Sequence, residues 1–211
     1  MFNGKISINA HSSIRVEAEK VIYFDPFKLT VEAHDADVIF LTHEHYDHCS
    51  PEDIAKCAND STTFVCPAVA ARVLAKAGIP AERTVVLAPG DKAEVCGLPV
   101  EAVAAYNILK PFHPKLNGDT GFVVTIGGAR VYVAGDTDKN RDNVGVKCDI
   151  ALVPAGGTYT MDAKAAAEFV NILKPEVAIP THYGSIVGKA DDGEKFAKLV
   201  DSSIRVELLI K

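Results

Sequence analysis

The stretch "DVIFLTHEHYDHCS", from Asp37 to Ser50, joins an apolar run to a dense group of polar side chains. Residues 37–41 have the β-branched and aromatic composition of a buried strand. Ser50 followed by Pro51 is typical of the start of a helix. The loop between these two elements carries three of the seven histidines of the chain. The stretch therefore predicts a strand end that presents polar side chains for chemistry.

The spacing inside this loop suits metal binding. His43 and His45 are two residues apart, so in an extended segment their side chains leave on the same side and can reach one ion. Asp47 and His48 follow as the chain turns toward the helix, where they can approach a neighbouring position. Imidazole and carboxylate together suit zinc, and also manganese or iron. The alternative is a polar turn whose histidines only form hydrogen bonds, and the spacing disfavours it. Strand alternation turns Glu44 to the opposite side, so we expect it to be structural.

Two later apolar segments end in the same way. "ARVYVAGDTD" places Asp136 after Gly135, and "EVAIPTHYGS" places His182 after Thr181. Strands that finish with such residues can bring them to one edge of a rigid scaffold. We therefore expect Asp136, a carboxylate able to bridge two ions, and His182 to join the group around His43.

Length and composition predict one compact domain over residues 1–211, since 48% of the residues are hydrophobic and 24% are charged. A net charge of -6 argues against nucleic acid as a partner. The chain has no apolar run of membrane-spanning length and no signal-peptide pattern, which predicts a cytoplasmic protein without a membrane partner. The five cysteines include no CxxC pair, so reduced thiols are expected.

Hydrophobic period and turn residues predict an α/β fold in which two sheets pack face to face with helices outside. The first half indicates strands in hairpins, and the second half alternates strands with helices. Helices are expected near residues 51–58 and 67–77, from Asp162 through "DAKAAAEFVNILK", and in "DGEKFAKLV". Strands are expected near residues 4–9, 13–17, 20–24, 37–41, 62–66, 84–87, 91–95, 99–105, 121–126, 129–134, 149–153, 176–180 and 204–210.

The motif His43-x-His45-x-Asp47-His48, followed by "GDTD" and "PTHYGS", resembles the metallo-β-lactamase superfamily. The opening "HSSIRVEAEKVIYFDPF" is similar to the start of its ascorbate-6-phosphate lactonase-like branch. The resemblance covers nearly the whole chain and implies a four-layer αβ/βα sandwich with one or two divalent ions. Zinc is the metal that we expect first, with manganese or iron as the other possibilities. It implies that His43 and His45 bind the first ion, that Asp47, His48 and His182 bind the second, and that Asp136 bridges them.

One position departs from this pattern. The family normally supplies a third histidine to the first ion, and Asn107 stands where it is expected. His113 lies six residues further on, a distance of about 20 Å if extended, so a loop that folds back could return it to the ion. We expect His113 to replace the missing ligand. In the alternatives, Asn107 binds the ion weakly through its side-chain oxygen, or His113 contacts the substrate or only lines a turn.

The sequence leaves the surroundings of two further residues open. Lys110 could bind an anionic group or could simply lie in a solvated loop. The resemblance places His11 near the centre, and we expect it beside the ligands rather than among them.

These features predict a metal-dependent hydrolase that uses a metal-bound hydroxide on a small ester, lactone or phosphoester. Asp47 is the expected catalytic residue, because its carboxylate can orient the water and accept a proton. A metal-binding protein without turnover is an alternative, since Asn107 could mark a modified first site. A nuclease-type phosphodiesterase is a further alternative that the net charge disfavours. Redox di-iron enzymes of the superfamily usually have a glutamate at the position of His45, so His45 argues against that class. The chain has no GxSxG, GxxxxGKS or GxGxxG motif, which argues against the chemistries built on them.

Overall fold

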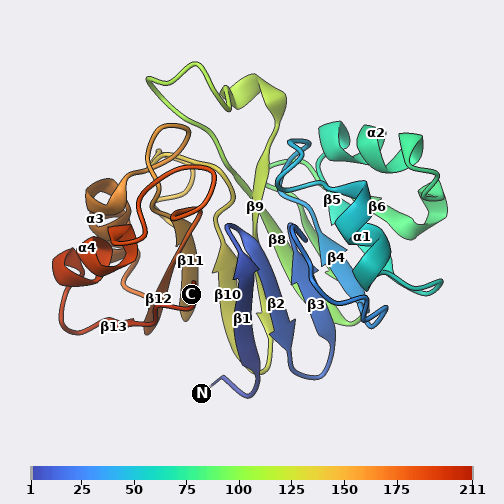
Figure 1. The fold of residues 1–211 in the computed structure, drawn as a ribbon, viewed down its shortest axis with the longest axis horizontal. Helices are drawn as coiled ribbons and strands as arrows, with labels where there is room; N and C mark the ends of the chain where they lie inside the picture. The colour runs from blue at the N-terminus through green and yellow to red at the C-terminus, as the bar shows by residue number, and fades with distance from the viewer. Residues whose placement is uncertain (1, 211) are drawn as a thin grey trace.

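The computed structural model describes residues 2–210, and it consists of two β-sheets packed face to face with helices on the outer sides (Figure 1). The predicted mixed α/β architecture is confirmed. The first sheet has the order β1-β2-β3-β4-β5-β6 and the second the order β13-β12-β11-β10-β9-β8-β7.

The first sheet contains an antiparallel and a parallel part. β1 to β3 form an antiparallel meander, whereas β3 to β6 pair in parallel. The sequence indicates mostly hairpins in this half, which holds for β1 to β3 and is wrong for the parallel part. Here α1 (Pro51–Cys57) joins β4 to β5 and α2 (Ala68–Lys76) leads from β5 toward β6, whereas an irregular loop joins β3 to β4. The strands are β1 (Lys5–Ala10), β2 (Ser13–Glu17), β3 (Val21–Phe24), β4 (Val38–Phe40), β5 (Thr63–Cys66) and β6 (Thr84–Val86).

In the second sheet, β7 to β10 are antiparallel and β10 to β13 are parallel. The predicted turn at Gly127 and Gly128 joins β9 to β10, and both glycines have positive φ, as a tight turn requires. The strands are β7 (Lys92–Val95), β8 (Leu98–Ala104), β9 (Thr120–Ile126), β10 (Ala129–Val133), β11 (Ile150–Pro154), β12 (Val177–Thr181) and β13 (Arg205–Val206). β13 is shorter than the predicted 204–210, because Leu209 and Ile210 leave the ladder to pack on the hydrophobic cores.

Helices α3 (Ala163–Leu173) and α4 (Asp192–Leu199) lie on the outer side of the second sheet, and short 3-10 helices occupy Ala81–Arg83 and Lys115–Asn117. Asp162 begins α3 as predicted, since its side chain accepts a hydrogen bond from the Ala165 amide. Across residues 2–210, no helix combines the length and the apolar character needed to cross a membrane.

The two sheets share an apolar core. The ring of Phe40 in the first sheet lies 4.8 Å from that of Phe24 and 5.2 Å from that of Phe122 in the second sheet. All three side chains are fully buried, and truncating a buried aromatic residue to alanine costs about 3–5 kcal/mol. This packing fixes the strand ends relative to each other.

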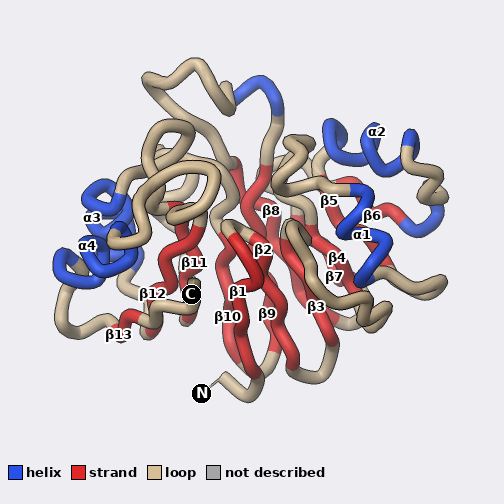
Figure 2. The backbone as a smooth tube through the Cα atoms, viewed as in Figure 1, coloured by secondary structure: helices blue, strands red, loops and turns tan. Residues whose placement is uncertain are grey.

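Long loops gather at one end of the sheets (Figure 2). The strands β4, β10 and β12 all finish at this end, directly before the polar residues singled out in the sequence. The fold therefore brings those residues to one place.

Candidate metal centre

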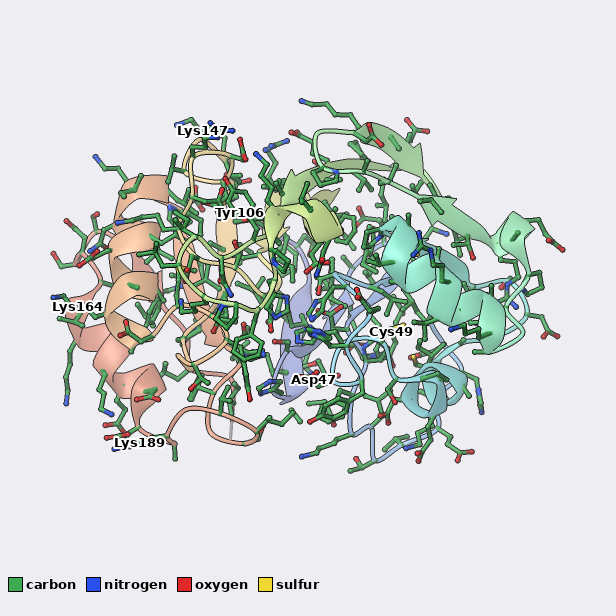
Figure 3. The ribbon with its side chains drawn as sticks, turned by 90° about the horizontal axis from the view of Figure 1, so that it is seen from above. Asp47, Cys49, Tyr106, Lys147, Lys164 and Lys189 are labelled. Carbon is green, nitrogen blue, oxygen red and sulfur yellow. The ribbon has the colours of Figure 1, made fainter. Side chains whose placement is uncertain are left out.

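The predicted ligand positions meet at this end of the sandwich. Asp136, which follows β10, lies between residues of both sheets: its Oδ2 is 3.0 Å from Nε2 of His182, and its Oδ1 is 3.4 Å from Nε2 of His48. Seen from above, Asp47 lies between the half of the molecule that carries α1 and α2 and the half that carries α3 and α4 (Figure 3). Its Oδ2 is 3.6 Å from Nε2 of His48 and 3.9 Å from Nε2 of His182.

Potential ligand atoms cluster in three overlapping groups. Within each group, one nitrogen or oxygen atom of every residue lies within 4.8 Å of those of the others. The groups are His43, His45 and His113; His11, Asp47, His48 and His182; and His43, His48 and Asp136. The third group shares His43 with the first and His48 with the second, so the three groups are neighbours.

The structure brings His113 to the position that the sequence left open. The ring of His113 lies 4.7 Å from that of His43 and 4.8 Å from that of His45. Asn107 belongs to none of the groups found among residues 2–210. Instead, its backbone N–H donates to the carbonyl of His113 at 2.9 Å, and its side-chain amide donates to the carbonyls of Phe112 at 3.0 Å and Tyr159 at 2.6 Å. Asn107 therefore holds the loop that carries His113.

His11 lies closer to the centre than predicted. It occupies the turn between β1 and β2, and its Nε2 is 3.3 Å from Oδ2 of Asp47. Its ring lies 3.7 Å from that of His182, and it is one of the four residues in the second group of ligand atoms. The local sequence "NAHSS" is that of an ordinary hairpin turn, so it carried no signal for this placement.

The donor set fits a divalent metal. Nε2 of His48, Nε2 of His182 and Oδ1 of Asp136 are buried without a hydrogen-bond partner in the part of the chain that the structure describes. An unsatisfied buried polar atom costs about 1–3 kcal/mol, so several of them facing one point need a partner there. Imidazole nitrogens and carboxylate oxygens are the donors that zinc, iron and manganese accept.

Buried carboxylates orient two of the histidines from behind. Oδ2 of Asp25 accepts a hydrogen bond from Nδ1 of His48 at 2.7 Å, and the same side chain accepts from the backbone N–H and the hydroxyl of Thr42. Oδ2 of Asp119 lies 3.1 Å from Nδ1 of His113. A proton on Nδ1 leaves the Nε2 lone pair free to face the centre. Sequence reasoning missed both carboxylates; the strand end "YFDPF" was the available signal for Asp25.

The charges of the centre are strongly coupled. Burial lowers the pKa of His48, but the carboxylates of Asp136 and Asp25 outweigh this effect and raise it to about 10. Burial likewise lowers the pKa of His113, and Asp119 and Asp136 raise it to about 9. Burial raises the pKa of Asp136, yet the surrounding histidines hold it well below its usual range. The carboxylates thus favour positive charge at this point.

Unusual backbone conformations place three of the histidines. His11, His113 and His182 have φ values of 56°, 53° and 59°, in the left-handed region that non-glycine residues rarely occupy. Each such residue costs about 1–3 kcal/mol, and such strain is concentrated at functional sites. Gly156 allows a close approach at one of them, since a Cβ atom there would lie 2.0 Å from the carbonyl oxygen of His182.

Comparisons with known proteins agree with this geometry. Residues 5–182 match the family described as the beta-lactamase superfamily domain. The UPF0173 metal-dependent hydrolase of Thermoplasma acidophilum is 34% identical over 214 residues, which cover 94% of this chain and 92% of the relative.

Solved structures have the same fold. A protein of Parabacteroides distasonis described as a metal-dependent hydrolase superposes over 100% of both chains with a TM-score of 0.82 and 28% identity. A metallo hydrolase of Ignicoccus hospitalis, at 22% identity, matches 98% of this chain and 95% of its own with a TM-score of 0.79, and so supports the fold alone. The chain therefore belongs to the UPF0173 metal-dependent hydrolases of the beta-lactamase superfamily.

Proposed function

We propose that this hydrolase cleaves a small ester, lactone or phosphoester with the help of one or two divalent ions. Zinc is the first candidate for the metal, followed by manganese or iron. The observation that carries the proposal is the convergence of three groups of ligand atoms around Asp136. A lactone would be the expected substrate of the ascorbate-6-phosphate lactonase-like branch that the opening sequence resembles.

Each candidate residue has a proposed role. His43, His45 and His113 would hold one ion, His48, His182 and Asp47 would hold a second, and Asp136 would contribute a carboxylate between the two groups. His11 positions Asp47, because its Nε2 lies 3.3 Å from the Asp47 carboxylate while its Nδ1 lies 3.2 Å from the Ser185 hydroxyl.

Asp47 is the proposed catalytic residue. A divalent ion lowers the pKa of a bound water from near 16 to about 7 and polarises the attacked oxygen. Burial raises the pKa of Asp47, but hydrogen bonding to His11 and the charge of His48 outweigh it and lower the pKa. Asp47 is therefore ionised at neutral pH, so that its carboxylate can orient the attacking water and accept a proton from it.

The alternatives have less support. The absence of a histidine at position 107 favoured a metal-binding protein without turnover, and the position of His113 beside His43 and His45 weakens that argument. The net charge of -6 continues to disfavour a nuclease, so we propose a small molecule as the substrate. A cytoplasmic location stays a prediction.

Elemental analysis and turnover test the proposal together. Protein purified without added metal should contain one to two equivalents of zinc, manganese or iron, and it should turn over some members of a panel of lactones, thioesters and phosphodiesters. Asp47→Asn should lower turnover by about 100-fold or more, whereas Asp60→Asn, on an exposed turn, should leave it unchanged. A chain that neither contains nor takes up a transition metal, or an Asp47→Asn variant with full turnover, would contradict the proposal.

A further inference from the structure

Exposed apolar side chains adjoin the metal centre in three separate loops. We call Tyr46, Phe112 and Ile186 the apolar rim; their exposed fractions are 66%, 42% and 37%. Each is the direct neighbour in sequence of a residue of the centre or of its support. Tyr46 lies between His45 and Asp47, Phe112 precedes His113, and Ile186 follows Ser185, whose hydroxyl lies 3.2 Å from Nδ1 of His11.

The contacts of these neighbours bring the three residues of the apolar rim near the same metal centre, since His45 contacts His113 and His11 contacts both Asp47 and Ser185. The rings of His45 and His113 are 4.8 Å apart, and consecutive Cα atoms are about 3.8 Å apart, so Tyr46 and Phe112 belong to adjacent stretches of backbone. The loop that joins β8 to β9, which carries Phe112, stands at the end of the sheets where the centre lies (Figure 1).

Aromatic contacts support the rim from outside. The Phe112 ring packs edge-on against Tyr159 at 4.6 Å, and the Tyr46 ring packs edge-on against Phe27 at 5.9 Å. Edge-to-face pairs of this kind are worth about 0.5–1.5 kcal/mol beyond the area that they bury. The side chains of Tyr46 and Phe112 thus each have a packing partner although they are partly exposed to solvent.

The cations of the loop that carries His113 are already neutralised. Lys110 forms an ion pair with Asp138, and Lys115 forms one with Asp142. The sequence left open whether Lys110 binds an anionic group, and this pairing disfavours it. Lys28, whose Nζ lies 5.2 Å from the centre of the Phe27 ring, is a cation near Tyr46 that an anionic substrate could use.

We propose that the substrate is an uncharged acyl compound whose alkyl or aryl portion packs on the apolar rim while its carbonyl faces the metal centre. Apolar side chains beside a few convergent polar groups are the usual composition of a small-molecule site. This inference rests on the proposed function and narrows it to carboxylic esters or lactones, excluding phosphoesters. One water is consumed, the bond between the acyl carbon and the leaving oxygen breaks, and a carboxylic acid and an alcohol form.

Binding of hydroxamic acids to the zinc-loaded protein tests the inference without relying on turnover. Acetohydroxamate has almost no tail and reports the centre alone, whereas hexanohydroxamate adds an apolar tail, and adipic monohydroxamate adds a tail that ends in a carboxylate. Calorimetric titration should show hexanohydroxamate binding at least about tenfold more tightly than acetohydroxamate and than adipic monohydroxamate.

Rim variants identify the origin of this preference. Tyr46→Ser combined with Ile186→Ser should remove the preference for hexanohydroxamate and leave acetohydroxamate binding unchanged. Phe112→Ser should have the same effect, with its zinc content measured because it adjoins His113. Leu199→Ser, an exposed apolar residue at the end of α4, is the matched control and should keep the preference.

Three results would overturn the inference. The first is a preference for the long tail that persists in the rim variants, and the second is binding of adipic monohydroxamate as tight as that of hexanohydroxamate and lost in Lys28→Ala. Either of these two results would contradict the inference about the substrate without contradicting the proposed metal-dependent function. The third, no binding of any hydroxamate to protein that has been offered zinc, removes the proposed function and the inference with it.

Discussion

Asp25 controls the orientation of His48 from a fully buried position. Replacing it by the isosteric asparagine in Asp25→Asn removes the charge that accepts the Nδ1 proton of His48 at 2.7 Å. We expect zinc affinity to fall by about 10- to 100-fold, since carboxylates behind ligating histidines contribute this much. Competition with a chromophoric chelator measures the change.

A carboxylate at the opposite end of the molecule provides the control for this substitution. Asp149 also accepts a backbone hydrogen bond, from the Arg130 amide at 2.7 Å, but it lies outside the groups of ligand atoms. Asp149→Asn should therefore keep the wild-type zinc affinity. Equal affinities of Asp25→Asn and the wild type would show that His48 needs no such support.

The sequence locates some residues of the site and not others, for a physical reason. His43, His45 and His48 share one loop, so their spacing is visible along the chain. Asp25 follows β3 and Asp119 precedes β9, and a lone aspartate beside a strand is indistinguishable from a turn residue. Their hydrogen bonds to His48 and His113 are visible only in the folded chain, whereas the resemblance of the opening stretch already indicates His11 near the centre.

At the scale of elements, Asp53 joins the start of α1 to the loop after β3. Its two carboxylate oxygens accept hydrogen bonds from the backbone N–H groups of Lys28 and Leu29, at 2.9 and 2.8 Å. Ser50, which caps α1, also donates to it at 3.0 Å. The loop between β3 and β4 has no regular structure of its own, and Asp53 ties its first part to the start of the helix, while backbone hydrogen bonds from His34 and Ala36 tie its last part to the end of the helix.

Asp53→Asn should destabilise the fold in a pH-dependent manner. Burial raises the pKa of Asp53, but hydrogen bonds from Lys56 and from the Leu29 amide outweigh it and lower the pKa. A carboxylate with a depressed folded-state pKa contributes stability above its unfolded pKa of about 4, and that stability is lost as pH falls through the folded-state pKa. We expect a loss of about 1–3 kcal/mol at pH 7 and a smaller loss at about pH 3, measured by urea unfolding.

Asp60, on an exposed turn after α1, supplies the matched substitution. Asp60→Asn should change the free energy of unfolding by less than about 0.5 kcal/mol at either pH. If the Asp53→Asn deficit were the same at both pH values, the charge of Asp53 would not be its cause.

The elements themselves follow from local signals, whereas their pairing does not. Ser50 and Asp162 cap helices at the predicted positions, and the Gly127-Gly128 turn joins the predicted hairpin. The parallel pairing of β3 to β6 depends on how the β3–β4 loop and then α1 and α2 return the chain, which no local pattern encodes. The end of β13 depends on a competition between ladder hydrogen bonds and the burial of Leu209 and Ile210.

For the molecule as a whole, the candidate ligands join segments that are far apart in the chain and belong to both sheets. His11 and His48 follow strands of the first sheet, and Asp136 and His182 follow strands of the second. An ion bound between them would connect the two sheets directly. Metal binding and global stability should therefore be linked.

Removing the ion should lower the midpoint of thermal unfolding. A ligand that binds only the folded state at a free concentration of 100 times its Kd stabilises by about 2.7 kcal/mol. For a chain of this size, a change of about 1 kcal/mol in the free energy of unfolding shifts the midpoint by about 2–4 °C. A chelator should therefore lower the midpoint by about 5–10 °C, measured by calorimetry. Asp136→Ala, which lacks the carboxylate proposed to bridge the ions, should unfold at a midpoint that the chelator hardly changes. A wild-type midpoint that does not respond to the chelator, in protein shown to lose its metal, would mean that the centre does not connect the sheets.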